Sequence, residues 1–185
     1  MAQTAPRKLT YDDLLALPED GLRHELIDGE HYVTPAPTLR HQRVSRRLTV
    51  ALDRFIERHD SGELFYAPCD VVFSPVNVVE PDLVFVAREH LGLLTESNIQ
   101  GAPDLVVEIL SPSTRKIDED VKRQLYDRMG VREYWLADPL RDTIRVYRRT
   151  GEDFLLAAEL SSGAAEVLTT PLLPGLEIPL ARIFA

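Results

Sequence analysis

The sequence predicts an α/β fold in which one mixed central sheet, flanked by helices, spans residues 1–185 as a single domain. Two apolar strands, near 83–86 and 105–110, carry a carboxylate each, and a long amphipathic helix precedes them. Helical and strand patterns continue after residue 112 without a repeat or a linker. Helices and strands interleaved in this order favour a mixed sheet packed between helices. A chain of 185 residues suits one domain with a full hydrophobic core.

The N-terminal half contains a hairpin and the longest helix. Thr10 is expected to cap a short helix over 11–17. Segments 23–27 and 30–34 flank Asp28-Gly29, a strong signal for a two-residue hairpin turn. From 38 to 59 apolar residues recur at helical spacing. His41 extends this inward stripe, and short strands are expected at 63–67 and 70–74.

The C-terminal half is expected to alternate between strands and helices. A helix over 118–129 ends at Gly130, which is a good C-terminal stop. A strand follows at 131–137, and a hairpin over 143–149 and 154–159 turns at Gly151. The tail over 176–185 should pack back as a strand fragment and a helical turn.

Composition and charge exclude several classes of protein. The lone Cys69 rules out a disulfide within the chain. No apolar run approaches the ~20 residues of a membrane span, and residues 1–8 lack the apolar core of a secretory signal. We therefore expect a cytoplasmic protein without a membrane partner. The net charge of −9 argues against a general nucleic-acid coating protein, although a nuclease needs only a local basic surface.

Glu108 is the most informative residue, because it sets a carboxylate into the apolar run from Leu105 to Leu110. Burying it unpaired would cost roughly several kcal/mol, so it must be neutralised, paired or bound to a metal. Asp82 opens a second apolar strand, and adjacent strands would bring the two acids together. Mg²⁺ takes carboxylate and carbonyl oxygens, and the Ile109 carbonyl is a candidate third ligand. The competing interpretation pairs Glu108 with an arginine and leaves Asp82 at the end of a loop.

Lys122 is the candidate cation beside these acids. The helix over 118–129 places Asp118, Lys122 and Tyr126 one turn apart, next to an apolar stripe. Lys122 can therefore reach the sheet from the edge of the buried face. A lysine beside a metal would position the attacking water or neutralise charge developing on phosphate. The competing interpretation is a surface Asp118–Lys122 pair, worth only ~0.3–0.5 kcal/mol.

Other polar residues are weaker candidates. Asp104 shares a strand face with Glu108 but sits roughly 13 Å away at ~3.3 Å per residue, so it is expected to cap the strand. Glu25 would by default be an exposed strand carboxylate, and His41 a satisfied core histidine. An arginine run at the start of the long helix could meet phosphates, although such a run is more often a solvated face; its members are Arg40, Arg43, Arg46 and Arg47.

Pro81-Asp82 followed by Glu108 in an apolar strand resembles the PD-(D/E)XK restriction-endonuclease-like superfamily. The stretch from Ala102 to Thr114 is similar, more specifically, to the Uma-type restriction endonuclease family. The resemblance covers roughly residues 10 to 180, and its further matching positions are Glu25 to Glu30, His41, Asp118, Lys122, Tyr126, Gly130-Val131 and Glu133 to Pro139. Two residues after Glu108, where the superfamily has its motif lysine, this chain has Leu110.

The resemblance implies a lysine supplied instead by the following helix, and Lys122 is the matching position. It also implies that Glu25 and His41 belong to the site, that Mg²⁺ or Mn²⁺ is required, and that the chain forms a homodimer.

The sequence thus predicts a metal-dependent DNA endonuclease. The predicted catalytic residues are Asp82, Glu108, Lys122 and Glu25; the predicted metal ligands are Asp82, Glu108 and Ile109; the predicted substrate contacts are His41, Arg40 and Arg43. One alternative is a non-catalytic interaction or nucleic-acid-binding domain that retains the nuclease fold. A further alternative is a phosphatase that acts on a small phosphate ester.

Overall fold

The computed structural model describes residues 7–185. Residues 1–6, which hold most of the segment inspected for a secretory signal, lie outside the described residues. Within 7–185, no helix combines the length and the apolar character needed to cross a membrane.

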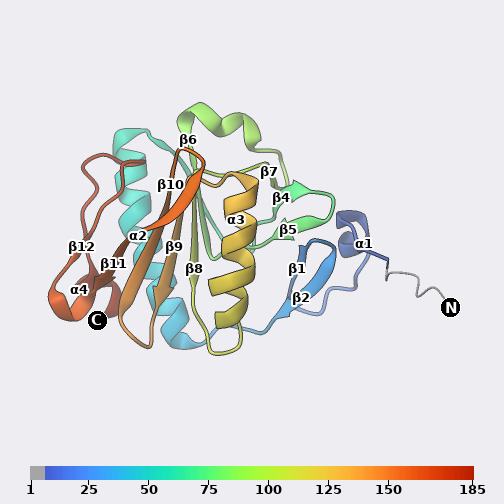
Figure 1. Ribbon diagram of the computed structural model, residues 1–185, viewed down its shortest axis with the longest axis horizontal. Coiled ribbons are helices and arrows are strands. Elements are labelled where there is room, and N and C mark those ends of the chain that lie inside the picture. Colours follow the sequence, from blue (N-terminus) through green and yellow to red (C-terminus); the bar gives the residue numbers. More distant parts are fainter. Residues whose placement is uncertain (1–6) are drawn as a thin grey trace.

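The predicted mixed α/β architecture is confirmed, with a central sheet at its heart (Figure 1). This sheet has six strands in the order β11 (Asp153–Ser161), β10 (Thr143–Thr150), β9 (Glu133–Asp138), β8 (Leu105–Ile109), β6 (Leu83–Ala87) and β3 (Gly62–Tyr66). Only β8 and β9 run parallel to each other; the other neighbours are antiparallel. The sheet is therefore mixed, as the sequence predicts.

A second sheet, which the sequence does not separate from the first, carries the N-terminal hairpin. Its order is β2 (Glu30–Thr34), β1 (Arg23–Ile27), β5 (Asn77–Val79), β4 (Val71–Ser74) and β7 (Ile99–Gln100). The predicted hairpin at Asp28-Gly29 is present, and β1 pairs on its other side with β5 through Leu26 and Val78. A two-stranded sheet of β12 (Val167–Leu168) and β13 (Ile178–Pro179) lies near the C-terminus.

The central strands are apolar on both faces because both faces are covered. Alternate residues such as Leu83, Leu105 and Val107 pack with α2 (Leu39–His59) and the C-terminal segment. Residues of the opposite parity, such as Val84 and Val106, pack with α3 (Arg123–Met129) and the second sheet. The remaining helical segments are α1 (Tyr11–Leu15), η1 (Arg88–Leu93), η2 (Ile117–Lys122), η3 (Ser162–Ala164) and α4 (Leu180–Phe184).

Helix α2 begins where the sequence predicts. The Thr38 side chain accepts a hydrogen bond from the backbone N–H of His41 at 3.3 Å, which satisfies one of the free donors of the first turn. The buried stripe of α2 contains His41, Val44, Leu48, Leu52 and Ile56. Because His41 lies in the first turn, the fold holds its ring at the end of α2 that borders β8.

Candidate active site

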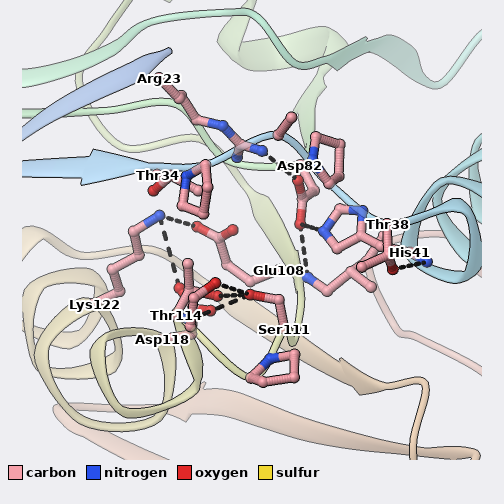
Figure 2. Close-up of a pocket in the computed structure, with 16 residues that line it drawn as sticks. Arg23, Thr34, Thr38, His41, Asp82, Glu108, Ser111, Thr114, Asp118 and Lys122 are labelled. Atoms are coloured by element: carbon pink, nitrogen blue, oxygen red, sulfur yellow. Dashed lines mark hydrogen bonds and ion pairs between the residues drawn. The ribbon is translucent and has the colours of Figure 1, made fainter.

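A cavity of about 280 Å³ gathers most of the predicted site residues (Figure 2). Its polar lining comes from β1, the first turn of α2, the residue before β6, the end of β8 and η2; these side chains include Arg23, His41, Asp82, Glu108, Asp118 and Lys122. The segments 34–38 and 111–114 complete the wall. Elements from both large sheets therefore meet at this cavity.

Glu108 lies at its centre and is bound by two donors. Lys122 Nζ donates to Glu108 Oε1 at 2.9 Å, and the Tyr126 hydroxyl donates to the same oxygen at 2.7 Å. Lys122 Nζ also lies 2.7 Å from Glu25 Oε1, so the lysine joins β8 to β1. The partner of Glu108 is thus a lysine rather than an arginine. Glu25 does not line the cavity, but it is buried, not exposed as its strand position alone would suggest.

The titration of these groups is strongly altered. Burial raises the pKa of Glu108 to about 8; Lys122 opposes this rise, while Asp118, Asp82 and Glu25 add to it. Burial disfavours the charged form of Lys122, but the negative charges of Glu108, Glu25 and Asp118 outweigh it and raise its pKa well above the ordinary value. Lys122 is therefore a permanent cation at neutral pH.

Asp82 forms a second ion-pair centre on the other side of the cavity. Its Oδ1 accepts from Arg23 at 3.1 Å, and its Oδ2 accepts from the Ile109 backbone N–H at 2.8 Å. His41 Nε2 lies 3.1 Å from the same Oδ2. Burial would raise the pKa of Asp82, but the hydrogen bond and charge of His41 and the charge of Arg23 hold it below the usual value. Asp82 is ionised at neutral pH.

His41 is not the satisfied core histidine of the alternative interpretation. Its Nε2 faces Asp82, whereas its Nδ1 is buried without a hydrogen-bond partner among residues 7–185. A buried polar atom without a partner is costly, so such an atom at a cavity wall indicates a place for water or a ligand. His41 lines the cavity, which fits the predicted contact with substrate.

The helix after β8 begins with a π-helical turn, η2, that carries Asp118 and Lys122. Single π turns inside helices occur frequently at functional sites. The two side chains lie 3.8 Å apart and are only 4% and 3% exposed, so the surface pair considered from sequence is wrong. Burial raises the pKa of Asp118 to about 6.

The residues present fit a divalent cation. Within residues 7–185, four carboxylates face only two permanent cations, Lys122 and Arg23; the carboxylates are those of Glu25, Asp82, Glu108 and Asp118. Both hydrogen bonds to Glu108 end on Oε1, which leaves its Oε2 without a protein donor among residues 7–185. A carboxylate offers about four lone-pair sites. Three contacts use three of those of Asp82, which leaves about one for a cation.

Few protein side chains would bind the cation directly. Within 7–185, no three His, Cys, Asp or Glu side chains converge as a ready metal site. Mg²⁺ is commonly held by one or two carboxylates with several waters, so Asp82 and Glu108 suffice for it. The Ile109 carbonyl stays a predicted ligand; the structure shows the amide of that residue bound to Asp82.

Two predicted substrate contacts, Arg40 and Arg43, and the weaker candidate Asp104 do not line the cavity. Arg40 pairs with Asp142 at 2.8 Å, and both it and Arg43 are exposed and absent from the cavity lining. Their contact with substrate stays a prediction. Asp104 is buried immediately before β8 and accepts from the Ala87 N–H at 2.7 Å, so it fixes neighbouring strands rather than the site.

Two charged residues that line the cavity, Arg23 and Asp118, are not among the site residues predicted from the sequence. Arg23 is two positions before Glu25 on β1, and alternate strand residues share a face, so the Glu25 candidate could have pointed to it. Asp118 is noted from the sequence as a helix neighbour of Lys122 and as a position that matches the family resemblance, but not as a site residue. Asp118 is buried beside Lys122, whose ammonium reaches Glu25 on β1 and Glu108 on β8, and no local pattern reveals this arrangement.

Comparisons with known proteins identify a family and a shared fold. A family model named Uma2, described as "putative restriction endonuclease", matches residues 11–181. A search of curated proteins found no match. The 1.96 Å crystal structure of a "putative nuclease belonging to DUF820" from Anabaena variabilis ATCC 29413 superposes with a TM-score of 0.79. It is 20% identical, and the alignment covers 95% of this chain and 97% of that one, which shows a shared fold.

The type IIG restriction endonuclease BpuSI is a more distant match. Its TM-score is 0.40 at 13% identity, with 82% of this chain and 16% of that one covered. At that score the likeness carries no weight for fold or function.

Proposed function

The chain belongs to the restriction-endonuclease family Uma2, and from this membership and its acidic cavity we propose that it is a metal-dependent DNA endonuclease. The observation that carries the proposal is the position of Asp82 and Glu108. They come from neighbouring strands, line one cavity, and face more negative charge than Arg23 and Lys122 neutralise. Such a centre suits a divalent cation together with a phosphodiester.

The proposed ligands are Asp82, Glu108 and the Ile109 carbonyl. A bound Mg²⁺ or Mn²⁺ supplies Lewis-acid stabilisation of charge on the phosphoryl group and makes water more acidic. Glu25 does not touch the cavity and acts through Lys122, whose ammonium it holds against Glu108.

The remaining side chains have distinct proposed roles. Lys122 stays protonated, so it neutralises charge that develops on phosphorus during in-line attack and does not act as the base. Asp118, with its pKa raised to about 6, is suited to accept the proton of the attacking water near neutral pH. His41 Nδ1 would bind the substrate or its water, and Arg40 and Arg43 would approach flanking phosphates.

A substrate panel tests the proposal. Purified protein is incubated with supercoiled plasmid, linear duplex, single-stranded DNA, RNA and p-nitrophenyl phosphate, each with Mg²⁺, with Mn²⁺ and with EDTA. We expect cleavage of DNA that EDTA abolishes. Hydrolysis of the monoester alone would identify a phosphatase instead. No hydrolysis of any substrate would favour a non-catalytic domain, in which the cations around Asp82 and Glu108 simply neutralise a buried network.

Metal binding is expected to depend on pH, because a proton and a cation compete for Glu108. With a pKa of about 8, Glu108 holds a proton at neutral pH in the metal-free protein, and Asp118 titrates near 6. Metal affinity should therefore rise from pH 6 to pH 8 and then level off, with protons released on binding. Calorimetry in buffers of different ionisation enthalpy measures both quantities. An affinity that stays flat across this range would contradict the proposed ligand.

The homodimer implied by the family resemblance is also a proposal. Light scattering at several protein concentrations measures it, and a monomer at all of them would refute it.

A further inference from the structure

A basic groove runs along α2, away from the acidic cavity. It has a volume of about 700 Å³ and lies between the second half of α2 and the C-terminal residues 175–183. We call it the α2 groove. Five arginines line it, namely Arg46, Arg47, Arg54, Arg58 and Arg182, against one carboxylate, Glu177. The α2 groove is therefore locally positive, although the whole chain has a net charge of −9.

A third hollow lies between the α2 groove and the acidic cavity and shares lining residues with each. This intermediate cavity of about 440 Å³ shares His41 and Asp82 with the acidic cavity. The same intermediate cavity shares Arg46 and Val50 with the α2 groove. The three hollows therefore follow one another along α2 from its first turn towards its C-terminus. A long substrate held at Asp82 can continue into the α2 groove without leaving the surface.

The arginines of this region are available for a ligand. Most arginines elsewhere form ion pairs with carboxylates. Those without such a partner among residues 7–185 are Arg43, Arg46, Arg47, Arg54, Arg58, Arg123 and Arg182. All of them except Arg123 lie on α2 or α4. Arg47 is occupied within the chain, because it donates to the Ile183 carbonyl at 3.1 Å and also to the backbone oxygen of Ala185.

The floor of the α2 groove is apolar and aromatic. Phe55 and His59 stack with ring centroids 4.0 Å apart, and Leu176 and Ile178 also line the groove. A groove that combines cations for a backbone with rings for bases is typical of sites for single-stranded nucleic acid. A duplex would present mainly phosphates and would leave the apolar floor unused. From Arg46 to Arg58 the helix rises about 18 Å, at ~1.5 Å per residue.

We infer that the α2 groove binds an unpaired DNA strand leading away from the acidic cavity, with Arg54 and Arg58 on its phosphates. This inference rests on the proposed endonuclease function, since it describes the flank of the strand that is cut. It adds a binding surface to the cavity and predicts that the enzyme holds its substrate beyond the scissile bond.

The test is binding of a fluorescein-labelled oligothymidylate of about ten nucleotides, measured by anisotropy in EDTA. The variant Arg54→Gln/Arg58→Gln should bind roughly tenfold more weakly than wild type at low salt. Its slope of log affinity against log salt should be shallower by about 1.4, for two lost contacts at ~0.7 each. Arg128→Gln/Arg141→Gln changes the charge equally at exposed arginines that do not line the groove, and it should bind like wild type.

Several results would overturn the inference. They are equal binding by wild type and Arg54→Gln/Arg58→Gln, no oligonucleotide binding by wild type, and preference for a duplex of the same length. Displacement by polyglutamate as effective as by unlabelled oligothymidylate would identify a site for an acidic polypeptide instead. Thermal unfolding of both variants checks the fold. Because binding is measured without a divalent cation, a chain that binds through the groove but cuts nothing would contradict only the endonuclease proposal.

Discussion

Replacing Lys122 with methionine is expected to lower the free energy of unfolding by about 3–5 kcal/mol at pH 8, the cost typical of breaking a buried ion pair from one side. The ammonium contacts both Glu108 and Glu25, and the Lys122 side chain is 3% exposed, so the substitution removes a buried counter-charge from two carboxylates. The loss should shrink as the pH falls, because Glu108 takes up a proton below about 8 and Asp118 below about 6, and neither then needs a counter-charge.

Denaturant unfolding at pH 8 and pH 5.5 measures this effect. Lys116→Met is the matched control: it makes the same substitution at an exposed position and should change stability by no more than ~0.5 kcal/mol. Equal stability of wild type and Lys122→Met at pH 8 would show that the ammonium does not hold these carboxylates.

Glu108→Gln is expected to remove cleavage while leaving the metal-free fold intact. Amide and protonated carboxyl have nearly the same shape, and Glu108 carries a proton at neutral pH in the absence of metal. The rate of DNA cleavage should fall on the order of 10²–10³-fold or more, because a neutral amide is a poor cation ligand.

The stability of this variant should depend on pH in a defined direction. A carboxyl whose pKa is raised on folding costs stability as pH rises from its unfolded value towards 8. Glutamine does not titrate, so the variant should gain stability relative to wild type across that range. Unfolding curves between pH 5 and pH 9 measure this difference. A stability difference between variant and wild type that does not shift in favour of the variant from pH 5 to pH 8 would contradict the raised pKa.

The parts of the site that the sequence predicts are those set by local pattern. The apolar run around Glu108 requires a buried strand, and a carboxylate in it requires a partner. Helical spacing after Thr38 places His41 on the buried side of α2, and the spacing of Lys122 places it at the edge of a buried face. Each of these inferences depends only on the spacing of apolar and polar residues within one strand or one helix.

What the sequence does not predict depends on packing between distant elements. Glu25 is paired with Lys122 of η2 and accepts a hydrogen bond from the Glu80 N–H, so distant segments surround it and its own strand gives no sign of its burial. The sequence does not predict the second sheet, because the strand that joins its two parts, β5, has only three residues and lies between Pro75 and Pro81. The π turn that carries Asp118 has no recognised local signature. These features arise where two sheets meet, and there the acidic cavity forms.

The most direct test of the central claim is nicking of supercoiled plasmid by wild type, Glu108→Gln and Glu63→Gln, prepared in parallel and assayed with Mn²⁺ and with EDTA. Glu63→Gln makes the same substitution at an exposed position on β3 and serves as the control. We predict nicking by wild type and Glu63→Gln, none by Glu108→Gln, and none by any of them in EDTA. Equal nicking by all three, or none by wild type, would contradict an endonuclease centred on Glu108.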